Sequence, residues 1–313
     1  MSFYIGLGRL KKEGILGMNR RNIDFISKYN KRSLFPLVDN KLQTKLLAQK
    51  HSINTPKLLG LIKYQHQIKD FKKKSLELNS FVIKPARGSG GKGILVISEQ
   101  RDGKFIKSSK DEISFEEISR HLTNILAGLY SLNGDQDEAI VEELILIDPL
   151  FENYSYQGVP DIRIIVFKGY PVMAMLRLST KDSDGKANLH QGAVGVGIGI
   201  RDGVAINAVK DGKRVNFHPD TKASFEDIAI PNWRELLMIA SSCYEMTNLG
   251  YIGVDLVLDK NRGAMLLELN ARPGLAIQIA NSKGLLHQLK RVENIELKES
   301  SVEKRVDFII NAS

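Results

Sequence analysis

The stretch that most constrains the fold is FVIKPARGSGGKGILVI, residues 81–97, which sets a glycine-rich turn between two short apolar runs. Apolar runs of strand length on either side of glycines predict an antiparallel hairpin. The turn consists of Gly88, Ser89, Gly90, Gly91, Lys92 and Gly93. Glycine tolerates positive φ, so consecutive amide hydrogens can converge on one anion while the lysine adds charge. The turn therefore predicts a phosphate-binding lid, with a merely flexible hairpin as the alternative.

The turn is not a P-loop. No glycine stands five residues before Gly91, Lys92 is followed by Gly93 in place of Ser or Thr, and the turn joins two strands instead of opening a helix. Lys84 is the only charge in the preceding run SFVIKP. A lysine inside a sheet that faces a helix needs an anionic partner, which a phosphate would supply. The alternative is a lysine whose ammonium reaches solvent at the end of the strand.

A second feature is a pair of isolated carboxylates near the end of the chain, Asp255 in GVDLVL and Glu268 in LLELN. If residues 260–263 form a four-residue hairpin loop, residue 259 pairs with 264 and Asp255 lies opposite Glu268. Asn270 then shares the face of Glu268. Close carboxylates repel unless a cation separates them, and these oxygen donors suit Mg²⁺ or Mn²⁺. The alternative is a salt bridge to Arg163 or Arg272.

Composition excludes several classes of protein. The chain is 42% hydrophobic and 26% charged, as in an ordinary globular protein. No apolar run is long enough for a membrane span, and charges interrupt the start too early for a signal peptide, so we expect a cytoplasmic protein. The single cysteine, Cys243, lies in an apolar periodic stretch, which excludes an internal disulfide and favours a core residue over a nucleophile.

The net charge of +9 is concentrated at the start, where residues 1–32 hold eight lysines and arginines against Glu13 and Asp24. Such a balance favours an anionic partner. Because no nucleic-acid signature accompanies it, the segment reads as a solvated basic arm, and nucleic acid is not indicated as a partner. Peripheral membrane contact through this arm and formation of a homo-oligomer both stay open.

The order of predicted elements favours an α+β fold with two lobes. Asp39 or Asn40 caps a helix through Lys50 whose apolar stripe would be Leu42, Leu46 and Leu47. Ser114 and Glu117 have the spacing of a capping box before an amphipathic helix. Strands dominate from Ala139 onward, and such separate blocks argue against a doubly wound parallel sheet. We expect a basic amino-terminal segment over 1–38, a small lobe with the glycine lid over 39–138, and a large lobe over 139–313.

Seven motifs in order resemble the ATP-grasp superfamily, specifically its RimK-like alpha-L-glutamate ligases. They are FVIKPARGSGGKGI, AIVEELI, DIRIIVF, AMLRLS, ANLHQGA, GVDLVL and LLELNARPG. The resemblance runs from about residue 39 to 279, and residues 1–38 look like the branch called sugar-transfer-associated or alpha-L-glutamate ligase-like ATP-grasp proteins. It implies two α+β lobes that grip ATP, with an amino-terminal domain that is reduced or absent.

The resemblance also implies roles for individual residues. Lys41 and Lys84 would contact phosphates, as would the glycine turn. The hinge that holds adenine would be Glu142, Glu143, Leu144 and Ile145, with Asp148 as a weaker candidate for the ribose. The metal ligands would be Asp255, Glu268 and Asn270. Positions that face the γ-phosphate and the acceptor carboxylate match Arg163, Arg177, Asn188 and His190, while an ordinary loop histidine is the alternative for His190. Arg272 would lie beside a forming acyl phosphate.

Such a site would join a carboxylate to an amine at the expense of ATP, so it needs no side-chain nucleophile. The substrates would be small molecules or a peptide terminus, glutamate among them. Arg272 stands where the ligases that modify ribosomal protein have a small residue. This arginine can bind a different anion, so glutamate is not inherited as the substrate from the family name. Two other functions stay open, an ATP-grasp kinase acting on a hydroxyl and a non-catalytic nucleotide-binding subunit.

Overall fold

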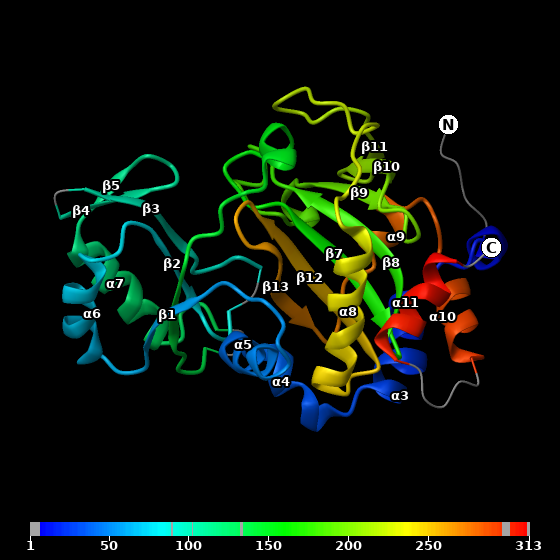
Figure 1. Cartoon of the computed structure of the whole chain (residues 1–313), viewed down its shortest axis with the longest axis horizontal. Helices are drawn as coiled ribbons and strands as arrows, with labels where there is room; N and C mark the ends of the chain where they lie inside the picture. The colour runs from blue at the N-terminus through cyan, green and yellow to red at the C-terminus, as the bar shows by residue number, and fades with distance from the viewer. Residues whose placement is uncertain (1–6, 89, 102, 132–133, 296–300, 312–313) are drawn as a thin grey trace.

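The chain folds into two α+β lobes, each built on one antiparallel sheet (Figure 1). The computed structural model describes residues 7–88, 90–101, 103–131, 134–295 and 301–311. Within them the smaller sheet has six strands in the order β1-β6-β2-β3-β4-β5, and the larger has seven in the order β11-β10-β9-β8-β7-β12-β13. The predicted α+β fold with two lobes is therefore confirmed.

The small lobe packs two helices on its sheet. Its strands are β1 Leu58–Ile62, β2 Phe81–Pro85, β3 Leu95–Arg101, β4 Lys104–Lys107, β5 Glu112–Ile113 and β6 Ala139–Glu142. The helices are α6 Gln67–Ser75 and α7 Phe115–Leu126. Ser114 and Glu117 form the predicted capping box at the start of α7. Ile118 and Leu122 of α7 join Phe71 of α6 in one buried cluster against the sheet.

The boundary predicted between the lobes at residue 139 is wrong. Strand β6 lies between β1 and β2 in the small sheet, where Ile140 pairs with Lys84. Its four residues are buried, and neighbouring strands pair with both of its edges. The chain crosses to the large lobe only after Glu142, and the crossing segment runs beside the end of β12, where the Leu146 amide donates to Asp259.

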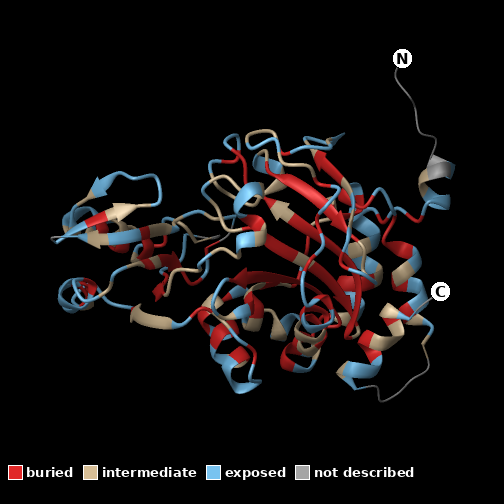
Figure 2. Ribbon diagram, turned by 45° about the horizontal axis from the view of Figure 1, so that its top comes forward, coloured by how far each residue is buried: buried red, intermediate tan, exposed pale blue. Residues whose placement is uncertain are grey.

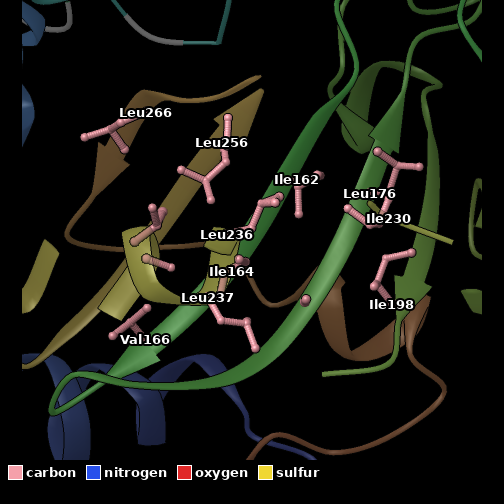
Figure 3. Close-up of a cluster of buried hydrophobic side chains, with 14 of the residues drawn as sticks. Ile162, Ile164, Val166, Leu176, Ile198, Ile230, Leu236, Leu237, Leu256 and Leu266 are labelled. Carbon is pink, nitrogen blue, oxygen red and sulfur yellow. The ribbon is translucent and has the colours of Figure 1, made fainter. Parts of the chain in front are cut away.

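The large lobe surrounds the seven-stranded sheet. Its strands are β7 Asp161–Phe167, β8 Tyr170–Leu178, β9 Val194–Ile198, β10 Ala205–Lys210, β11 Lys213–Arg214, β12 Tyr251–Asp259 and β13 Gly263–Asn270. The helices are α8 Trp233–Thr247, α9 Ala276–Ala280, α10 Leu286–Glu293 and α11 Val302–Ile310, with 3-10 turns η3 Pro149–Tyr154 and η4 Leu189–Gln191. Two-residue alternation sorts the core: Ile162 and Ile164 of β7 pack toward α8 (Figure 3), whereas Ile165 packs on the opposite face, toward α9 and α10.

The amino-terminal segment is part of the large lobe and not a solvated arm. It contains α1 Leu7–Lys12, α2 Met18–Arg20, η1 Arg21–Ile26, α3 Ser27–Tyr29, η2 Arg32–Leu34 and α4 Pro36–Asp39. Leu16, Phe25 and Ile26 are buried against the sheet face that carries α9 and α10. The Asn30 amide donates to the Tyr251 carbonyl at 2.7 Å and accepts from its N–H at 2.8 Å. The sequence prediction considered only the charges and overlooked the apolar residues between them.

The sheets of the two lobes differ in how far they are buried (Figure 2). In the large lobe, strands β7, β8 and β9 are buried almost throughout and β12 along its whole length, whereas β10 and β11 at one edge are partly exposed. In the small lobe, β4 and β5 at the outer edge are partly exposed. No helix among the described residues is long and apolar enough to cross a bilayer.

Candidate functional site

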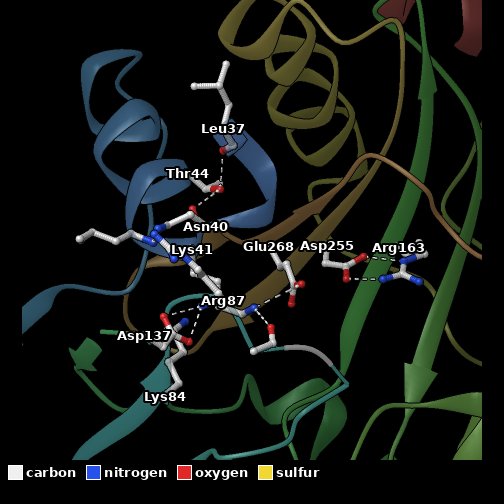
Figure 4. A network of polar contacts seen from close by, with 12 residues as sticks. Leu37, Asn40, Lys41, Thr44, Lys84, Arg87, Asp137, Arg163, Asp255 and Glu268 are labelled. Atoms are coloured by element: carbon white, nitrogen blue, oxygen red, sulfur yellow. Dashed lines mark hydrogen bonds and ion pairs between the residues drawn. The ribbon is translucent and has the colours of Figure 1, made fainter. Parts of the chain in front are cut away.

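Lys41 connects the two lobes at the candidate site (Figure 4). It begins α5, Lys41–Lys50, and the Asn40 side chain caps this helix by accepting from the amides of residues 42 and 43. The Lys41 ammonium donates to the carbonyl of Gly88 in the glycine turn at 2.6 Å. It also lies 3.6 Å from Oε1 of Glu268 on β13. The turn and the late carboxylate, 180 residues apart in sequence, therefore face each other across one side chain.

The glycine turn has the geometry that its sequence predicts. Strands β2 and β3 pair as an antiparallel hairpin, with Phe81 opposite Ile97. Gly90, Gly91 and Gly93 have φ of 63°, 75° and 75°, a region that side chains disfavour. A Cβ at Gly93 would lie 2.6 Å from the Tyr130 ring, so only glycine fits there. Ser89 lies outside the described residues.

The turn also approaches the large lobe. A Cβ built on Gly91 would lie 3.6 Å from Cδ of Lys186, which follows β8. Lys92 is exposed, while His121 of α7 lies within hydrogen-bonding distance of the Gly93 carbonyl at 2.9 Å. The end of the turn is thus fixed on the small lobe, and its tip reaches across to the large lobe.

Lys84 finds its anionic partner within the protein. Its side chain is only 8% exposed, and its ammonium lies 2.6 Å from Oε2 of Glu142 on the neighbouring β6. The alternative of a lysine that reaches solvent is wrong for this structure. Lys45 of α5, 5% exposed, approaches the other oxygen of Glu142 at 2.9 Å. Glu142, expected at the adenine hinge, therefore directs its side chain between two lysines.

The surroundings of this trio are mostly closed. Burial lowers the pKa of Lys45, although the nearby Glu142 opposes that change. Burial alone would raise the pKa of Glu142, but the two lysines outweigh it and hold that pKa below its usual value. A cavity of about 10 Å³ lies here, close to the least that holds one water molecule. Its lining comes from both lobes: Lys41, Thr44, Lys45, Thr55, Lys84, Glu142, Leu266 and Leu267.

The large lobe contributes charges from four strands to one face of its sheet. Asp255 pairs with Arg163 of β7 on one side and with Glu268 of β13 on the other, and Asp161 pairs with Arg177 of β8. The predicted register of the last hairpin is wrong at its tip, where Asp259 pairs with Gly263. A bulge between residues 255 and 256 shifts the register by one and still brings Asp255 opposite Glu268.

Two arginines hold Asp255 firmly. Arg163 makes a two-pronged contact, with Nε at 2.7 Å and Nη2 at 2.6 Å from the two carboxylate oxygens. Arg177 donates from Nη2 to Asp255 at 2.7 Å and from Nε to Asp161 at 2.5 Å. The salt bridge to Arg163, left open as an alternative for Asp255, is therefore present. The described contacts leave Nη1 of each arginine available to an anion.

The two aspartates of this network differ in ionisation. Burial raises the pKa of Asp161 to about 6, since the neighbouring Asp255 charge adds to burial while Arg177 only partly offsets both. Burial acts on Asp255 in the same direction, but Arg163 and Arg177 hold its pKa below the usual range. Asp255 thus stays a carboxylate, which keeps both guanidinium groups in place.

The protein's oxygen donors could supply only part of the coordination shell of a divalent cation. Glu268 is 38% exposed, with Lys41 as its ion-pair partner in the described structure. Oδ1 of Asn270 accepts the Arg272 N–H at 2.8 Å, and Oδ1 of Asp255 accepts one hydrogen bond. Each of these two oxygens therefore retains a lone pair that a cation could use. No three His, Cys, Asp or Glu side chains cluster as metal ligands in the described ranges. Two carboxylates and an amide fit Mg²⁺ if substrate phosphates complete its coordination.

The predicted adenine hinge is the crossing segment between the lobes. Glu143, Leu144 and Ile145 follow β6 directly and are partly exposed. Nη1 of Arg262 binds the Glu143 carboxylate at 2.5 Å. The Asp148 carboxylate caps η3 by accepting from the amide of residue 150, so one of its oxygens is already used locally.

The remaining predicted residues lie farther from this network. Asn188 caps the short turn η4 and accepts the His190 N–H at 3.0 Å, and His190 is exposed. No contact within the described ranges joins either residue to Asp255 or Glu268. Arg272 is 59% exposed and lies 3.7 Å from Asp39. Its guanidinium stacks over a phenylalanine of the amino-terminal segment, with 4.9 Å to the ring centroid.

Two residues of the site were missed by the sequence analysis, Lys45 and Asp161. Lys45 stands four residues after Lys41, and that helical spacing places both on one face, which could have revealed it. The leucine stripe assigned to this helix was partly wrong, because Leu46 is 46% exposed while Lys45 is buried. Asp161 alternates with Arg163 in DIRIIVF and so shares its face, a signal available from period two.

Comparison with solved structures finds several that align with most of this chain. D-cycloserine synthetase DcsG aligns over 84% of this chain and 72% of its own, with 15% identity and a TM-score of 0.50. D-alanine–D-alanine ligase from Bacillus anthracis, complexed with ATP, aligns over 89% and 66%, with 15% identity and a TM-score of 0.46. The ATP-grasp ligase PsnB, complexed with a minimal-precursor variant, Mg and ADP, covers 85% and 62%, with 12% identity and a TM-score of 0.44.

Comparison with curated proteins gives no match. A family model described as sugar-transfer associated ATP-grasp matches residues 20–294, most of the chain. That match includes both lobes and much of the amino-terminal segment, and it confirms the resemblance of the seven motifs to the ATP-grasp superfamily. The chain belongs to the sugar-transfer associated ATP-grasp family.

Proposed function

We propose that the protein is an ATP-dependent ligase that joins a carboxylate to an amine through an acyl-phosphate intermediate. The observation that carries the proposal is the position of Lys41, whose ammonium lies 2.6 Å from the glycine turn and 3.6 Å from Glu268. A turn suited to phosphate and oxygen donors suited to a cation thus flank one lysine. A synthetase is among the proteins of similar structure, in keeping with this reaction.

The nucleotide would lie between the lobes. Lys41 and Lys84 would bind its phosphates together with amides of the glycine turn, while the segment from Glu142 to Ile145 would hold adenine and Asp148 the ribose. Mg²⁺ or Mn²⁺, held by Asp255, Glu268 and Asn270, would offset the charge on the transferring phosphate. A cytoplasmic location accompanies the proposal, and the one cysteine, buried and free, is compatible with a reducing compartment.

The arginines would position the reacting groups. Nη1 of Arg163 and of Arg177 would bind the γ-phosphate and the substrate carboxylate, because Asp255 fixes both guanidinium planes. Arg272, exposed beside Asp39, would contact the acyl phosphate or another anion of the substrate. His190 and Asn188 would bind substrate only if their loop closes. Glutamate, another amino acid or a peptide terminus would meet these requirements.

The test is a screen for release of ADP and phosphate across amino acids, short peptides and sugar acids, with hydroxylamine as the trapping amine. A ligase releases both products and yields a hydroxamate from the acyl phosphate. Glu268→Gln should abolish turnover and leave the unfolding midpoint unchanged, whereas Glu226→Gln at an exposed site should retain turnover. ADP formation without free phosphate would instead identify a kinase. Normal turnover by Glu268→Gln would remove the metal assignment.

A further inference from the structure

The trio of Lys45, Glu142 and Lys84 carries one more positive than negative charge in a buried space. The side chains of the two lysines and of Glu142 are 5%, 8% and 4% exposed. Two ammonium groups around one carboxylate are unusual in a protein interior, because each buried ion costs free energy unless it is paired. One lysine would suffice to neutralise Glu142, so the second needs an explanation.

The two lysines are held differently. Lys84 makes the shorter contact, 2.6 Å from Oε2, and lies on the strand that leads into the glycine turn. Lys45 contacts the Pro56 carbonyl as well as Glu142, so α5 and the segment before β1 both fix it. Oε1 of Glu142 accepts no well-directed hydrogen bond from the described residues, so the contact with Lys45 is ionic.

We propose that Lys45 is a positioning residue for nucleotide binding: it keeps Glu142 neutralised when Lys84 turns from that carboxylate to a nucleotide phosphate. The inference rests on the proposed function, since it needs a phosphate in the cleft. Without Lys45, the same movement of Lys84 would leave a buried carboxylate alone, which is costly. With Lys45, the movement exchanges one anionic partner of Lys84 for another and leaves a neutral pair behind.

The small cavity beside the trio fits this exchange. It has room for about one water molecule and is lined by Lys41, whose ammonium contacts the glycine turn. The charged groups that face Glu142 are Lys45 from α5 and Lys84 from β2, with Lys41 of α5 across the cavity. Arg262, in the turn between β12 and β13, acts on Lys45 from a distance. Among the described residues, no other carboxylate lines the cavity to replace Glu142.

The test is binding of the non-hydrolysable nucleotide AMPPNP with Mg²⁺, measured by calorimetry between pH 6 and pH 8. Lys45→Met should weaken binding by roughly 10- to 100-fold at pH 8, as expected for an uncompensated buried charge. Its Glu142 should then take up a proton when nucleotide binds, because an isolated buried carboxylate has a raised pKa. The affinity of the variant should therefore improve relative to wild type as the pH falls, with proton uptake visible in buffers of different ionisation enthalpy.

A double variant separates this role from a merely structural one. In Lys45→Met with Glu142→Gln no buried anion remains, so AMPPNP should bind more tightly than to Lys45→Met alone, without the additional proton. This variant also tests the inference if Lys45→Met alone fails to fold. Lys50→Met, at an exposed position of the same helix, is the matched control and should bind as wild type does.

The outcomes distinguish the two proposals. Failure of the wild-type protein to bind AMPPNP with Mg²⁺ would overturn the proposed function and this inference with it. Wild-type binding together with Lys45→Met affinity within twofold of wild type, or with a double variant as weak as the single one, would overturn only the role of Lys45. Weak binding by Lys45→Met that the double variant restores would support it.

Discussion

The two buried charge clusters of this protein are built on opposite plans. In the small lobe, two lysines surround one glutamate and leave a surplus positive charge. In the large lobe, Arg163 and Arg177 balance two aspartates, Asp161 and Asp255. A lysine ammonium is a point charge on a flexible stem, whereas an arginine is a planar fork that fixes direction. The lysine cluster therefore allows one ammonium group to change its anionic partner, whereas the arginine cluster holds its guanidinium groups in one orientation.

This difference matches the work proposed for each end of the cleft. A nucleotide that enters and leaves requires a cation that can move to it, which Lys84 can do while Lys45 remains. A reacting carboxylate requires donors held in one direction, which the two-pronged contact of Arg163 with Asp255 provides. The contrast predicts that the large-lobe cluster is intolerant of losing a member and that the small-lobe cluster is tolerant.

The strongest test of the contrast is Asp255→Ala. The substitution removes the buried ion-pair partner of Arg163 and one of the two partners of Arg177, which keeps Asp161. We expect the free energy of unfolding to fall by about 3 to 5 kcal/mol, the usual cost of an unpaired buried charge. Urea denaturation measures it. Asp307→Ala, which breaks an exposed pair with Arg234, is the control and should cost less than about 1 kcal/mol. Equal losses in both variants would contradict a fixed large-lobe cluster.

The pH dependence of stability tests the same cluster through Asp161. Burial raises the pKa of this carboxyl from 3.8 to about 6 in the folded protein. A raised pKa means that the folded state holds the proton more tightly, so the contribution of Asp161 to stability is fully present below pH 3.8 and is lost as the pH rises through 6. The loss amounts to about 2 to 3 kcal/mol at 1.4 kcal/mol per pKa unit.

Asp161→Asn cannot titrate and isolates this contribution. The unfolding free energy of wild type minus that of the variant should decrease between pH 4 and pH 6, measured by denaturant unfolding at each pH. Asp307→Asn, at an exposed pair, serves as the control and should show no such slope. A difference that stays flat across this range would show that Asp161 is already ionised at low pH and that the aspartates do not compete.

A third prediction concerns the backbone of the glycine turn at Gly93. Gly93→Ala must adopt a φ of 75° and bring its Cβ against the Tyr130 ring, whereas Gly103→Ala has the same φ and open space around it. The two variants share the backbone cost, so Gly93→Ala should be less stable than Gly103→Ala by about 1 to 2 kcal/mol, the cost of overpacking. Thermal unfolding compares them. Equal midpoints would mean that Tyr130 moves away freely and that the turn is not fixed at this end.

The sequence was sufficient to predict what depends on local pattern. The hairpin around the glycine turn, the capping box at Ser114 and the opposition of Asp255 and Glu268 all follow from turn chemistry and side-chain periodicity. The prediction that Asp255 lies opposite Glu268 was right only because two errors in the predicted register cancel. The turn is one residue tighter than predicted, and a bulge shifts the register back. A bulge leaves no mark in a single sequence, so the agreement there was partly fortunate.

The errors arise where a contact joins distant parts of the chain. The predicted boundary misplaced β6 because pairing with β1 and β2 is a property of the sheet and not of the strand. Lys45 was missed because its burial depends on Glu142, almost one hundred residues away. The prediction of a solvated arm over the amino-terminal segment was wrong because it rested on charge alone. The buried Phe25 packs on a distant part of the chain that the sequence does not indicate. Local pattern identifies the parts, and only tertiary contact reveals their partners.

The smallest expected effect completes the comparison. Lys84→Met removes one of two cations from Glu142 and leaves the Lys45–Glu142 pair, so the free energy of unfolding should change by less than about 1 kcal/mol. Adding Lys45→Met should then cost about 3 kcal/mol or more, because Glu142 loses its last partner. Single and double variants, measured by urea denaturation, should thus be strongly non-additive. A large loss already in Lys84→Met would mean that both lysines are needed for folding, and the small-lobe cluster would then be as fixed as the arginine cluster of the large lobe.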